Sequence, residues 1–225
     1  MLIRNLNDYQ TFVFDCDGVI LNSNKIKTDS FRKVLTPFGN IAAEKLIKYH
    51  VKNGGVSRYA KFKYFLDEIY PKFGNSITKP NFDDLLNNYG DLCLESLFHS
   101  EVTSDLKRLK KNFSNLHWMI VSGGDEIELN KVFEYKEIKD FFEKGIFGSP
   151  ESKTEILRRE ILNKNIRMPA LYFGDSKKDY IASLKNGLDF VFIKKWTEFK
   201  EYKTFCKKKS ILVLNSIGDI AKIES

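Results

Sequence analysis

The distribution of hydrophobic residues divides the chain into three parts. A short apolar run at 11–14 is followed by Asp15, Asp17 and Gly18, and such a run predicts a buried strand that ends at polar groups. Apolar residues then recur every three or four positions, which predicts helices over 24–35, 41–51, 57–70 and 82–98. No strand pattern interrupts this helical block.

From about residue 103 the pattern alternates between helices and strands. We expect strands at 117–121, 145–147, 170–173, 190–193 and 211–214, and helices at 103–111, 126–134, 153–163, 177–186 and 197–206, with a closing helix from 217. Such alternation is typical of a parallel sheet that helices cover on both faces. The predicted fold class is therefore α/β, with a Rossmann-like parallel sheet core from residues 1–20 and 100–225 and an inserted all-helical segment from residues 21–99.

Composition excludes several classes of protein. A chain of 225 residues that is 42% hydrophobic and 14% aromatic is not intrinsically disordered. No apolar run approaches the roughly 20 residues that span a bilayer, and the first ten residues lack the apolar stretch of a signal peptide. We therefore expect a soluble, cytoplasmic protein. Cys16, Cys93 and Cys206 show no CxxC spacing, which argues against a zinc site or a disulfide framework.

The formal net charge is +7, and lysines are densest late in the chain. This excess would attract anionic ligands, and it is compatible with a solvated lysine surface or with weak binding of nucleic acid. The lysines are scattered over many predicted helices, and no nucleic-acid-binding motif is recognised. A nucleic-acid-binding module is therefore the less favoured interpretation, which a salt-dependent interaction with oligonucleotides would revive.

Two carboxylates follow the first predicted strand. Asp15 and Asp17 are two residues apart, so they would point the same way if both were on the strand, and their repulsion would need a divalent cation or a shared proton. The carboxyl ends of parallel strands are where open α/β sheets bind ligands. An ordinary turn at Asp17-Gly18 is the alternative interpretation.

Three later strands also end in polar clusters. Ser122, followed by two glycines, could offer a hydroxyl and backbone N–H groups to an oxyanion. Lys153 opens a predicted helix, where its charge opposes the helix dipole unless an anion holds it. Asp175 and Asp179 lie one helical turn apart and can converge on one ion or its waters, or can serve as a helix cap and an exposed side chain.

Taken together, these clusters resemble the four ordered motifs of the haloacid dehalogenase-like hydrolase superfamily. The motifs are FDCDGV at 14–19, Ser122 at a strand end, Lys153, and GDSKKDYIASLKNG at 174–187. The resemblance covers essentially the whole chain and implies the Rossmann-like core with an inserted helical cap, residues 21–99.

The resemblance also implies roles for the four carboxylates. Asp15 would be the nucleophile that forms an aspartyl-phosphate, and Asp17 would protonate the leaving oxygen and later activate water. Mg²⁺ would be held by Asp15, Asp175 and the backbone carbonyl of Asp17, with Asp179 nearby.

Two further groups of residues receive roles by the same analogy. Ser122, the backbone of Gly123, and Lys153 would bind the phosphoryl oxygens. In the cap, we expect Arg58, with Ser57 and Lys61, to reach the substrate from a glycine-rich loop. The alternative is that Ser57 simply caps a surface helix.

The function that the resemblance implies is a Mg²⁺-dependent phosphatase acting on a small phosphorylated metabolite, such as a sugar phosphate or a phosphoglycolate-like monoester. A phosphomutase of the β-phosphoglucomutase type is the alternative, since it would share all four motifs and the cap. A catalytically silent scaffold is disfavoured, because every chemical position is intact. The sequence leaves the exact substrate and the oligomeric state open.

Overall fold

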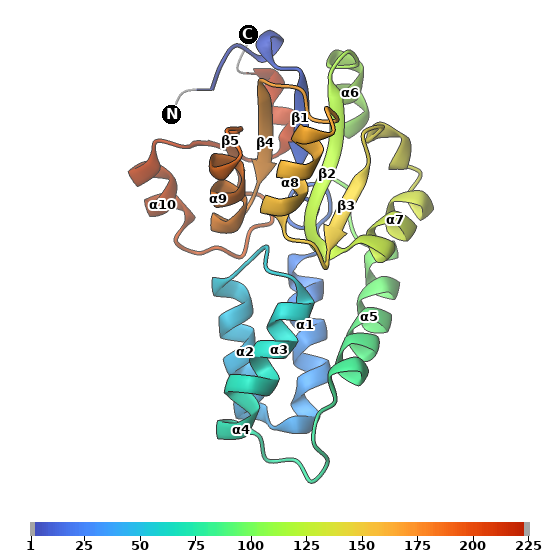
Figure 1. Ribbon diagram of the computed structural model, residues 1–225, viewed down its shortest axis with the longest axis vertical. Helices are drawn as coiled ribbons and strands as arrows, with labels where there is room; N and C mark the ends of the chain where they lie inside the picture. Colours follow the sequence, from blue (N-terminus) through green and yellow to red (C-terminus); the bar gives the residue numbers. More distant parts are fainter. Residues whose placement is uncertain (1–2, 223–225) are drawn as a thin grey trace.

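A six-stranded parallel sheet forms the upper half of the molecule (Figure 1), in the order β3-β2-β1-β4-β5-β6. The computed structural model describes residues 3–222. The strands are β1 Thr11–Phe14, β2 His117–Asp125, β3 Ile146–Ser149, β4 Ala170–Gly174, β5 Asp189–Ile193 and β6 Leu212–Leu214. Because β1 pairs with both β2 and β4, the first strand lies inside the sheet. The predicted α/β fold with a Rossmann-like core is confirmed.

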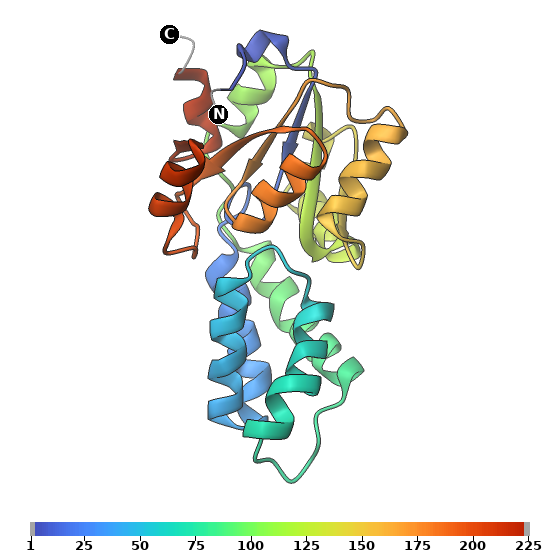
Figure 2. The same cartoon turned by 60° about the vertical axis from the view of Figure 1, so that its left-hand side comes forward.

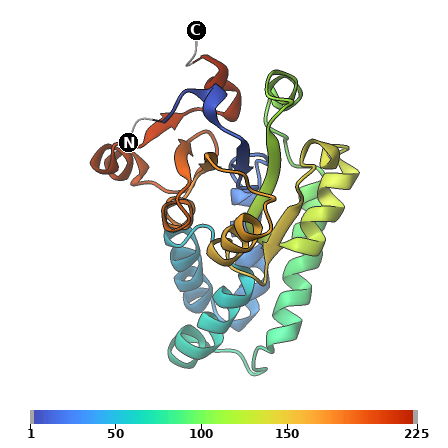
Figure 3. The same cartoon turned by 45° about the horizontal axis from the view of Figure 1, so that its top comes forward.

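Helices cover both faces of this sheet, as Figure 3 shows. Successive residues of a strand point to opposite faces, so Phe12 and Phe14 enter one hydrophobic cluster while Val13 enters the other. The first cluster packs under α6 Leu106–Asn112 and α7 Glu126–Tyr135, and the second under α8 Lys153–Leu162, α9 Lys177–Lys185 and α10 Tyr202–Lys209. A strand buried on both faces explains the uninterrupted apolar run at 11–14.

A separate bundle of helices lies below the sheet in Figures 1 and 2. Its helices are α1 Asn24–Leu35, α2 Asn40–Lys52, α3 Arg58–Tyr64, α4 Tyr70–Phe73 and α5 Phe82–Phe98, with a π-helical turn at Phe65–Ile69. The ring of Phe31 lies 5.1 Å from that of Phe62 and 4.2 Å from that of Tyr89, which ties α1, α3 and α5 together. Within residues 3–222, no helix is both long and apolar enough to cross a membrane.

Several predicted elements differ from the structure in extent or type. Strand β2 does not stop at 121 but continues to Asp125, because its last residue pairs with Ser149 of β3 after a register shift. The helix predicted over 197–206 begins only at Tyr202, because the hydroxyl of Thr197 bonds the backbone of a neighbouring loop instead. The closing segment Ile217–Lys222 is a 3-10 helix, not an α-helix.

The bundle contacts the sheet domain through a buried ion pair. Arg58 at the start of α3 donates from both terminal nitrogens to the carboxylate of Glu128 on α7, with one bond of 2.6 Å. The hydroxyl of neighbouring Tyr59 donates to Asp125 at 2.7 Å. Backbones also meet here, since a Cβ added to Gly123 would lie 2.5 Å from the carbonyl oxygen of Gly55. The loop that precedes α3 is therefore held against the end of β2.

We expect Glu128→Gln to weaken this junction, because it leaves the buried Arg58 guanidinium without its counter-charge. Breaking a buried pair from one side costs about 3–5 kcal/mol, so chemical denaturation should show a loss of that order. Glu134→Gln is the matched control, because Glu134 is an exposed residue of the same helix whose one ion pair within residues 3–222 is with Lys139, and its cost should stay below about 0.5 kcal/mol. Equal costs for the two variants would show that the Arg58–Glu128 pair does not secure the bundle.

Candidate active site

The polar ends of the strands meet at one edge of the sheet. Phe14 pairs with Phe173, so Asp15 and Asp175 emerge beside each other, one after β1 and the other after β4. Lys153, the first residue of α8, places its Nζ 2.7 Å from Oδ1 of Asp15 and 2.5 Å from Oδ1 of Asp179. The structure thus brings together four residues from three widely separated stretches of the sequence.

Three of these residues form a buried acidic cluster. Asp15, Asp175 and Asp179 each contribute a carboxylate oxygen, and these oxygens lie within 4.8 Å of one another. Burial and the charge of Asp179 raise the pKa of Asp15 to about 7, although Lys153 opposes the rise. Burial and Asp15 likewise raise the pKa of Asp175 well above its usual range. Oxygen donors with excess negative charge suit a hard divalent cation, so the residues present fit such an ion.

Asp179 reaches this cluster because of how α9 begins. Ser176 is the N-cap of α9, and its hydroxyl accepts from the N–H of Asp179 at 3.3 Å. In return, Oδ2 of Asp179 accepts from the N–H of Ser176 at 3.0 Å and from its hydroxyl at 2.6 Å. Asp179 is fully buried. The alternative interpretation, with Asp175 as the cap and Asp179 exposed, was therefore wrong.

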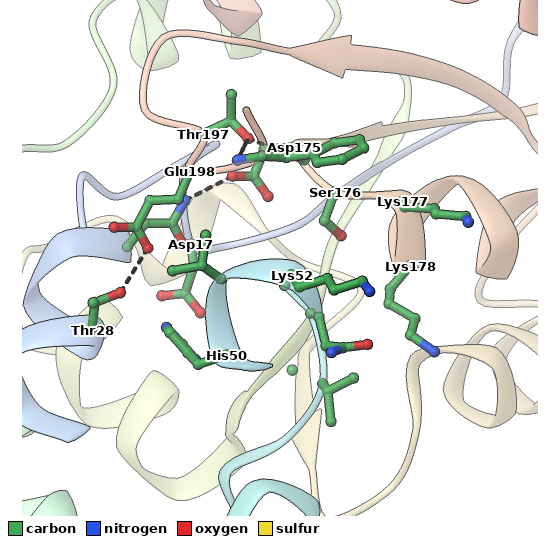
Figure 4. A pocket seen from close by; sticks show the side chains of 18 of the residues that line it. Asp17, Thr28, His50, Lys52, Asp175, Ser176, Lys177, Lys178, Thr197 and Glu198 are labelled. Atoms are coloured by element: carbon green, nitrogen blue, oxygen red, sulfur yellow. Dashed lines mark hydrogen bonds between the residues drawn. The ribbon is translucent and has the colours of Figure 1, made fainter. Parts of the chain in front are cut away.

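Asp17 points away from the acidic cluster and toward α1. The hydroxyl of Ser23 donates to its Oδ1 at 2.6 Å, and the ammonium of Lys27 lies 2.5 Å from its Oδ2. Burial alone would raise the pKa of Asp17, but Lys27 and Ser23 outweigh burial and lower the pKa below its usual value. The residue is held as an oriented carboxylate, with its side chain in the pocket of Figure 4.

The turn between Asp15 and α1 depends on Gly18. Its φ of +78° is in the left-handed region, and an added Cβ would come within 2.2 Å of Oδ2 of Asp175. Only glycine meets both conditions without a steric penalty. The Asp-Gly step therefore lets the chain pass directly beside the carboxylate of Asp175.

Two residues position Asp175 that the sequence analysis did not identify. The side-chain amide of Asn24 donates to Oδ2 of Asp175 at 2.7 Å, and the hydroxyl of Thr197 donates to its backbone carbonyl at 2.7 Å (Figure 4). Lys27 was missed as well. The only signal was that Asn24 and Lys27 are polar, three residues apart and therefore on one side of the first turns of α1.

Ser122 is fully buried near the end of β2, and its oxygen accepts from the N–H of Gly124 at 3.0 Å. The hydroxyl hydrogen has no acceptor within residues 3–222, so it remains available to an anion. Gly123 and Gly124 line the cavity beside it. These groups provide the hydroxyl and backbone surface that the sequence suggested for this strand end.

A cavity of about 1260 Å³ separates the sheet edge from the bundle. The sheet domain contributes Asp15, Asp17, Lys153 and Asp175 to its wall, and the bundle contributes helices α1, α2 and α3. Figure 4 shows another part of the cavity wall, where Glu198 accepts from the hydroxyl of Thr28 at 2.7 Å. The acidic cluster therefore opens into a space large enough for a small metabolite.

The three bundle residues expected at the substrate differ in position. Ser57 caps α3 by accepting from the N–H of Ala60 at 3.3 Å and does not line the cavity. Arg58 lines the cavity, but Glu128 occupies its guanidinium and Tyr89 packs on it with a 4.7 Å ring-centroid distance. Lys61 lines the cavity and is 4% exposed, and its ammonium makes no hydrogen bond or ion pair within residues 3–222.

The charge of Lys61 is therefore destabilised. Burial and the nearby Lys27 lower the pKa of Lys61 from 10.5 to about 7. The titratable groups that face it from the surrounding elements are Asp17, Lys27, His50, Lys153 and Glu198. An unpaired buried ammonium is costly, so the fold retains this residue at the expense of stability.

We expect Lys61→Met to stabilise the protein. Between pH 7 and 10.5 the unfolded chain binds a proton at Lys61 that the folded protein does not, so this lysine lowers the free energy of unfolding progressively as pH falls through that window. The gain from Lys61→Met should be full below pH 7 and vanish above 10.5.

One pKa unit corresponds to about 1.4 kcal/mol, and with local relaxation we expect a gain of about 1–3 kcal/mol at pH 7. Denaturation at pH 7 and pH 10 measures it. Lys63→Met, on the exposed side of the same helix, should change stability by less than about 0.5 kcal/mol. A loss of stability in Lys61→Met at both pH values would contradict the assignment.

Several solved structures resemble this protein over nearly its whole length. A predicted phosphoglycolate phosphatase from Haemophilus somnus superposes with a TM-score of 0.76 at 16% identity, covering 98% of this chain and 100% of that chain. A predicted phosphatase from Clostridium acetobutylicum gives 0.69 at 18% identity, with coverages of 95% and 97%. CbbY from Rhodobacter sphaeroides, solved in complex with phosphate, gives 0.70 at 14% identity, with coverages of 94% and 96%.

At these identities the solved structures establish a shared fold. No curated protein gives a significant match. The family model of haloacid dehalogenase-like hydrolases, however, matches residues 12–193, which is most of the chain and includes all the acidic groups of the site. The chain therefore belongs to the haloacid dehalogenase-like hydrolases.

Proposed function

We propose that the protein is a Mg²⁺-dependent phosphatase that hydrolyses a small phosphorylated metabolite through an aspartyl-phosphate. The substrate would be a sugar phosphate or a phosphoglycolate-like monoester. The observation that carries the proposal is the buried contact of Lys153 with Asp15 and Asp179 at the wall of the cavity. The phosphatases named among the similar structures, and the phosphate complex of CbbY, support it.

The acidic cluster would hold the cation. Asp15, Asp175 and the backbone carbonyl of Asp17 would be its protein ligands, with Asp179 nearby to support the site. When bound, Mg²⁺ would neutralise the carboxylates and the negative charge of the phosphoryl group.

Asp15 is placed to act as the nucleophile. Its Oδ1 accepts from Lys153 and from the N–H of Cys16 at 2.8 Å, so the carboxylate has a fixed orientation at the cavity wall. Attack of a carboxylate oxygen on phosphorus forms the aspartyl-phosphate and breaks the bond to the leaving oxygen. The ammonium of Lys153 reduces the repulsion between this carboxylate and the phosphate dianion.

Asp17 would move the protons. In its protonated form Asp17 would give its proton to the leaving oxygen in the first step. The resulting carboxylate would then take a proton from the water that attacks the phosphorus and releases Asp15, which restores the protonated form. The oxygens of Asp17 are held by Ser23 and Lys27. This hold orients the carboxylate for the second step and connects it to the bundle through α1.

The remaining core residues would bind the phosphoryl oxygens. The hydroxyl of Ser122, the backbone N–H of Gly123 and the ammonium of Lys153 are all donors from the strand ends. The bundle, residues 21–99, would act as a cap that excludes water during the transfer. We also propose a cytoplasmic location, which suits an enzyme that acts on small metabolites. A phosphomutase is not favoured, since the matching family is one of hydrolases.

We expect Asp15→Asn to abolish phosphate release. An amide is not a nucleophile at phosphorus, so kcat should fall by at least about 10³-fold with Mg²⁺ and a panel of sugar phosphates, phosphoglycolate and an aryl phosphate. Asp29→Asn is the control, because Asp29 is a partly exposed residue of α1 that pairs with Lys25 and Arg32. Residual activity of Asp15→Asn near the wild-type rate would contradict the covalent route.

We expect removal of divalent metal by EDTA to stop phosphate release, and added Mg²⁺ to restore it. Mg²⁺ should also raise the melting temperature of the wild type, because a cation that binds only the folded state stabilises it. Asp175→Asn removes one carboxylate of the cluster, so its melting temperature should respond less. A metal-independent rate, or an equal Mg²⁺ response in both proteins, would argue against this cation site.

A further inference from the structure

Four buried lysine and arginine side chains line the cavity, and three of them have anionic partners. Lys27 pairs with Asp17, Arg58 with Glu128, and Lys153 with Asp15 and Asp179, all within hydrogen-bonding distance. Lys61 is the fourth, and within residues 3–222 no acceptor lies within hydrogen-bonding distance of its ammonium. Among the buried lysine and arginine side chains of this wall, Lys61 is therefore the one that no acidic side chain of residues 3–222 pairs with.

The position of Lys61 complements that of the acidic cluster. Lys61 belongs to α3 in the bundle, whereas Asp15 follows β1 and Lys153 opens α8 in the sheet domain. Its Nζ lies 5.7 Å from the ring centroid of Phe31, which also lines the cavity. A ligand held at the strand ends can therefore extend from there toward a positive charge set in an apolar wall.

The neighbours of Lys61 do not supply its counter-charge. Burial, together with Lys61 and Lys27, lowers the pKa of His50 well below its usual value, so this imidazole is neutral. Asp17 and Glu198 favour the charged form of Lys61, but neither makes a hydrogen bond or ion pair with its ammonium: Glu198 accepts from the hydroxyl of Thr28, and Asp17 pairs with Lys27. Arg58, the other cap residue expected at the substrate, is occupied by Glu128.

We propose that Lys61 binds a second anionic group of the substrate, a carboxylate or a second phosphate, while the phosphoryl group to be cleaved lies at Asp15 and Lys153. This inference rests on the proposed phosphatase function and narrows its substrates to phosphomonoesters that carry a further anion. Such a ligand supplies the negative charge that the buried ammonium lacks.

The test uses pairs of phosphomonoesters that differ in the second anion. Glycerol 3-phosphate is compared with 3-phosphoglycerate for a carboxylate, and fructose 6-phosphate with fructose 1,6-bisphosphate for a phosphate. We expect the wild type to favour the second member of at least one pair by tenfold or more in kcat/KM. Lys61→Met should reduce that preference at least tenfold, mainly through KM, whereas Lys63→Met on the exposed side of α3 should keep it.

Binding is measured separately from turnover, in the Asp15→Asn background. At least one of 3-phosphoglycerate and fructose 1,6-bisphosphate should raise the melting temperature of Asp15→Asn more than the other member of its pair, and this difference should be lost in Asp15→Asn/Lys61→Met. A larger preference within the first pair would indicate a carboxylate, and a larger preference within the second pair would indicate a phosphate. Equal kcat/KM values within both pairs, or a preference and a thermal shift that survive Lys61→Met, would overturn the proposal.

The two proposals fail in different ways. If no ester, including p-nitrophenyl phosphate, releases phosphate, the phosphatase function fails, while the thermal shifts still report whether Lys61 binds the second anion. If phosphate is released but Lys61→Met leaves the preference unchanged, only the role of Lys61 is overturned.

Discussion

The site depends on the charge of Lys153. Its ammonium lies between Asp15 and Asp179, and all three residues are buried. Three converging carboxylates would otherwise repel one another in surroundings that screen charge poorly. One lysine offsets only part of this repulsion. Together with burial, the repulsion that remains raises the pKa values of Asp15 and Asp175. The same excess of negative charge makes the cluster suited to a divalent cation.

The helical bundle is part of this network and not only a cover over it. Lys27 of α1 neutralises Asp17, and Asn24 of the same helix donates to Asp175. Arg58 of α3 joins α7 on the other side of the cavity. Because these contacts cross from the bundle to the strand ends, movement of the bundle would change the polar surroundings of the carboxylates. The position of the bundle and the surroundings of the carboxylates are thereby coupled through individual side chains.

Arg58 and Lys61 show how neighbouring cations acquire different roles. They lie one helical turn apart on α3, and both are buried. Arg58 meets the carboxylate of Glu128, which satisfies its planar guanidinium at two points. Lys61 meets the ring of Phe31 and open cavity. A paired cation secures an interface, whereas an unpaired one retains its capacity to bind an anion.

Most of the elements and the chemical groups at the strand ends could be predicted from the sequence. The apolar runs predicted all six strands. Polar residues follow these runs, and parallel strands carry their carboxyl ends to the same side, so Asp15, Ser122, Lys153 and Asp175 were expected at one edge of the sheet. Local patterns contain this information, since burial on both faces and the turn after a strand are both short-range properties.

Only the tertiary structure decided which polar groups are paired. Thr197 was predicted to open a helix, yet it holds the backbone of Asp175, and α10 begins at Tyr202. Ser57, Arg58 and Lys61 were all expected from the sequence to contact the substrate. In the structure Ser57 caps α3 and Arg58 pairs with Glu128, whereas Lys61 lines the cavity with no ionic partner within residues 3–222. The reason is physical: a charge is neutralised by whatever residue lies within a few ångströms in space, and for Arg58 and Lys61 that neighbourhood was set by the packing of the bundle against the sheet.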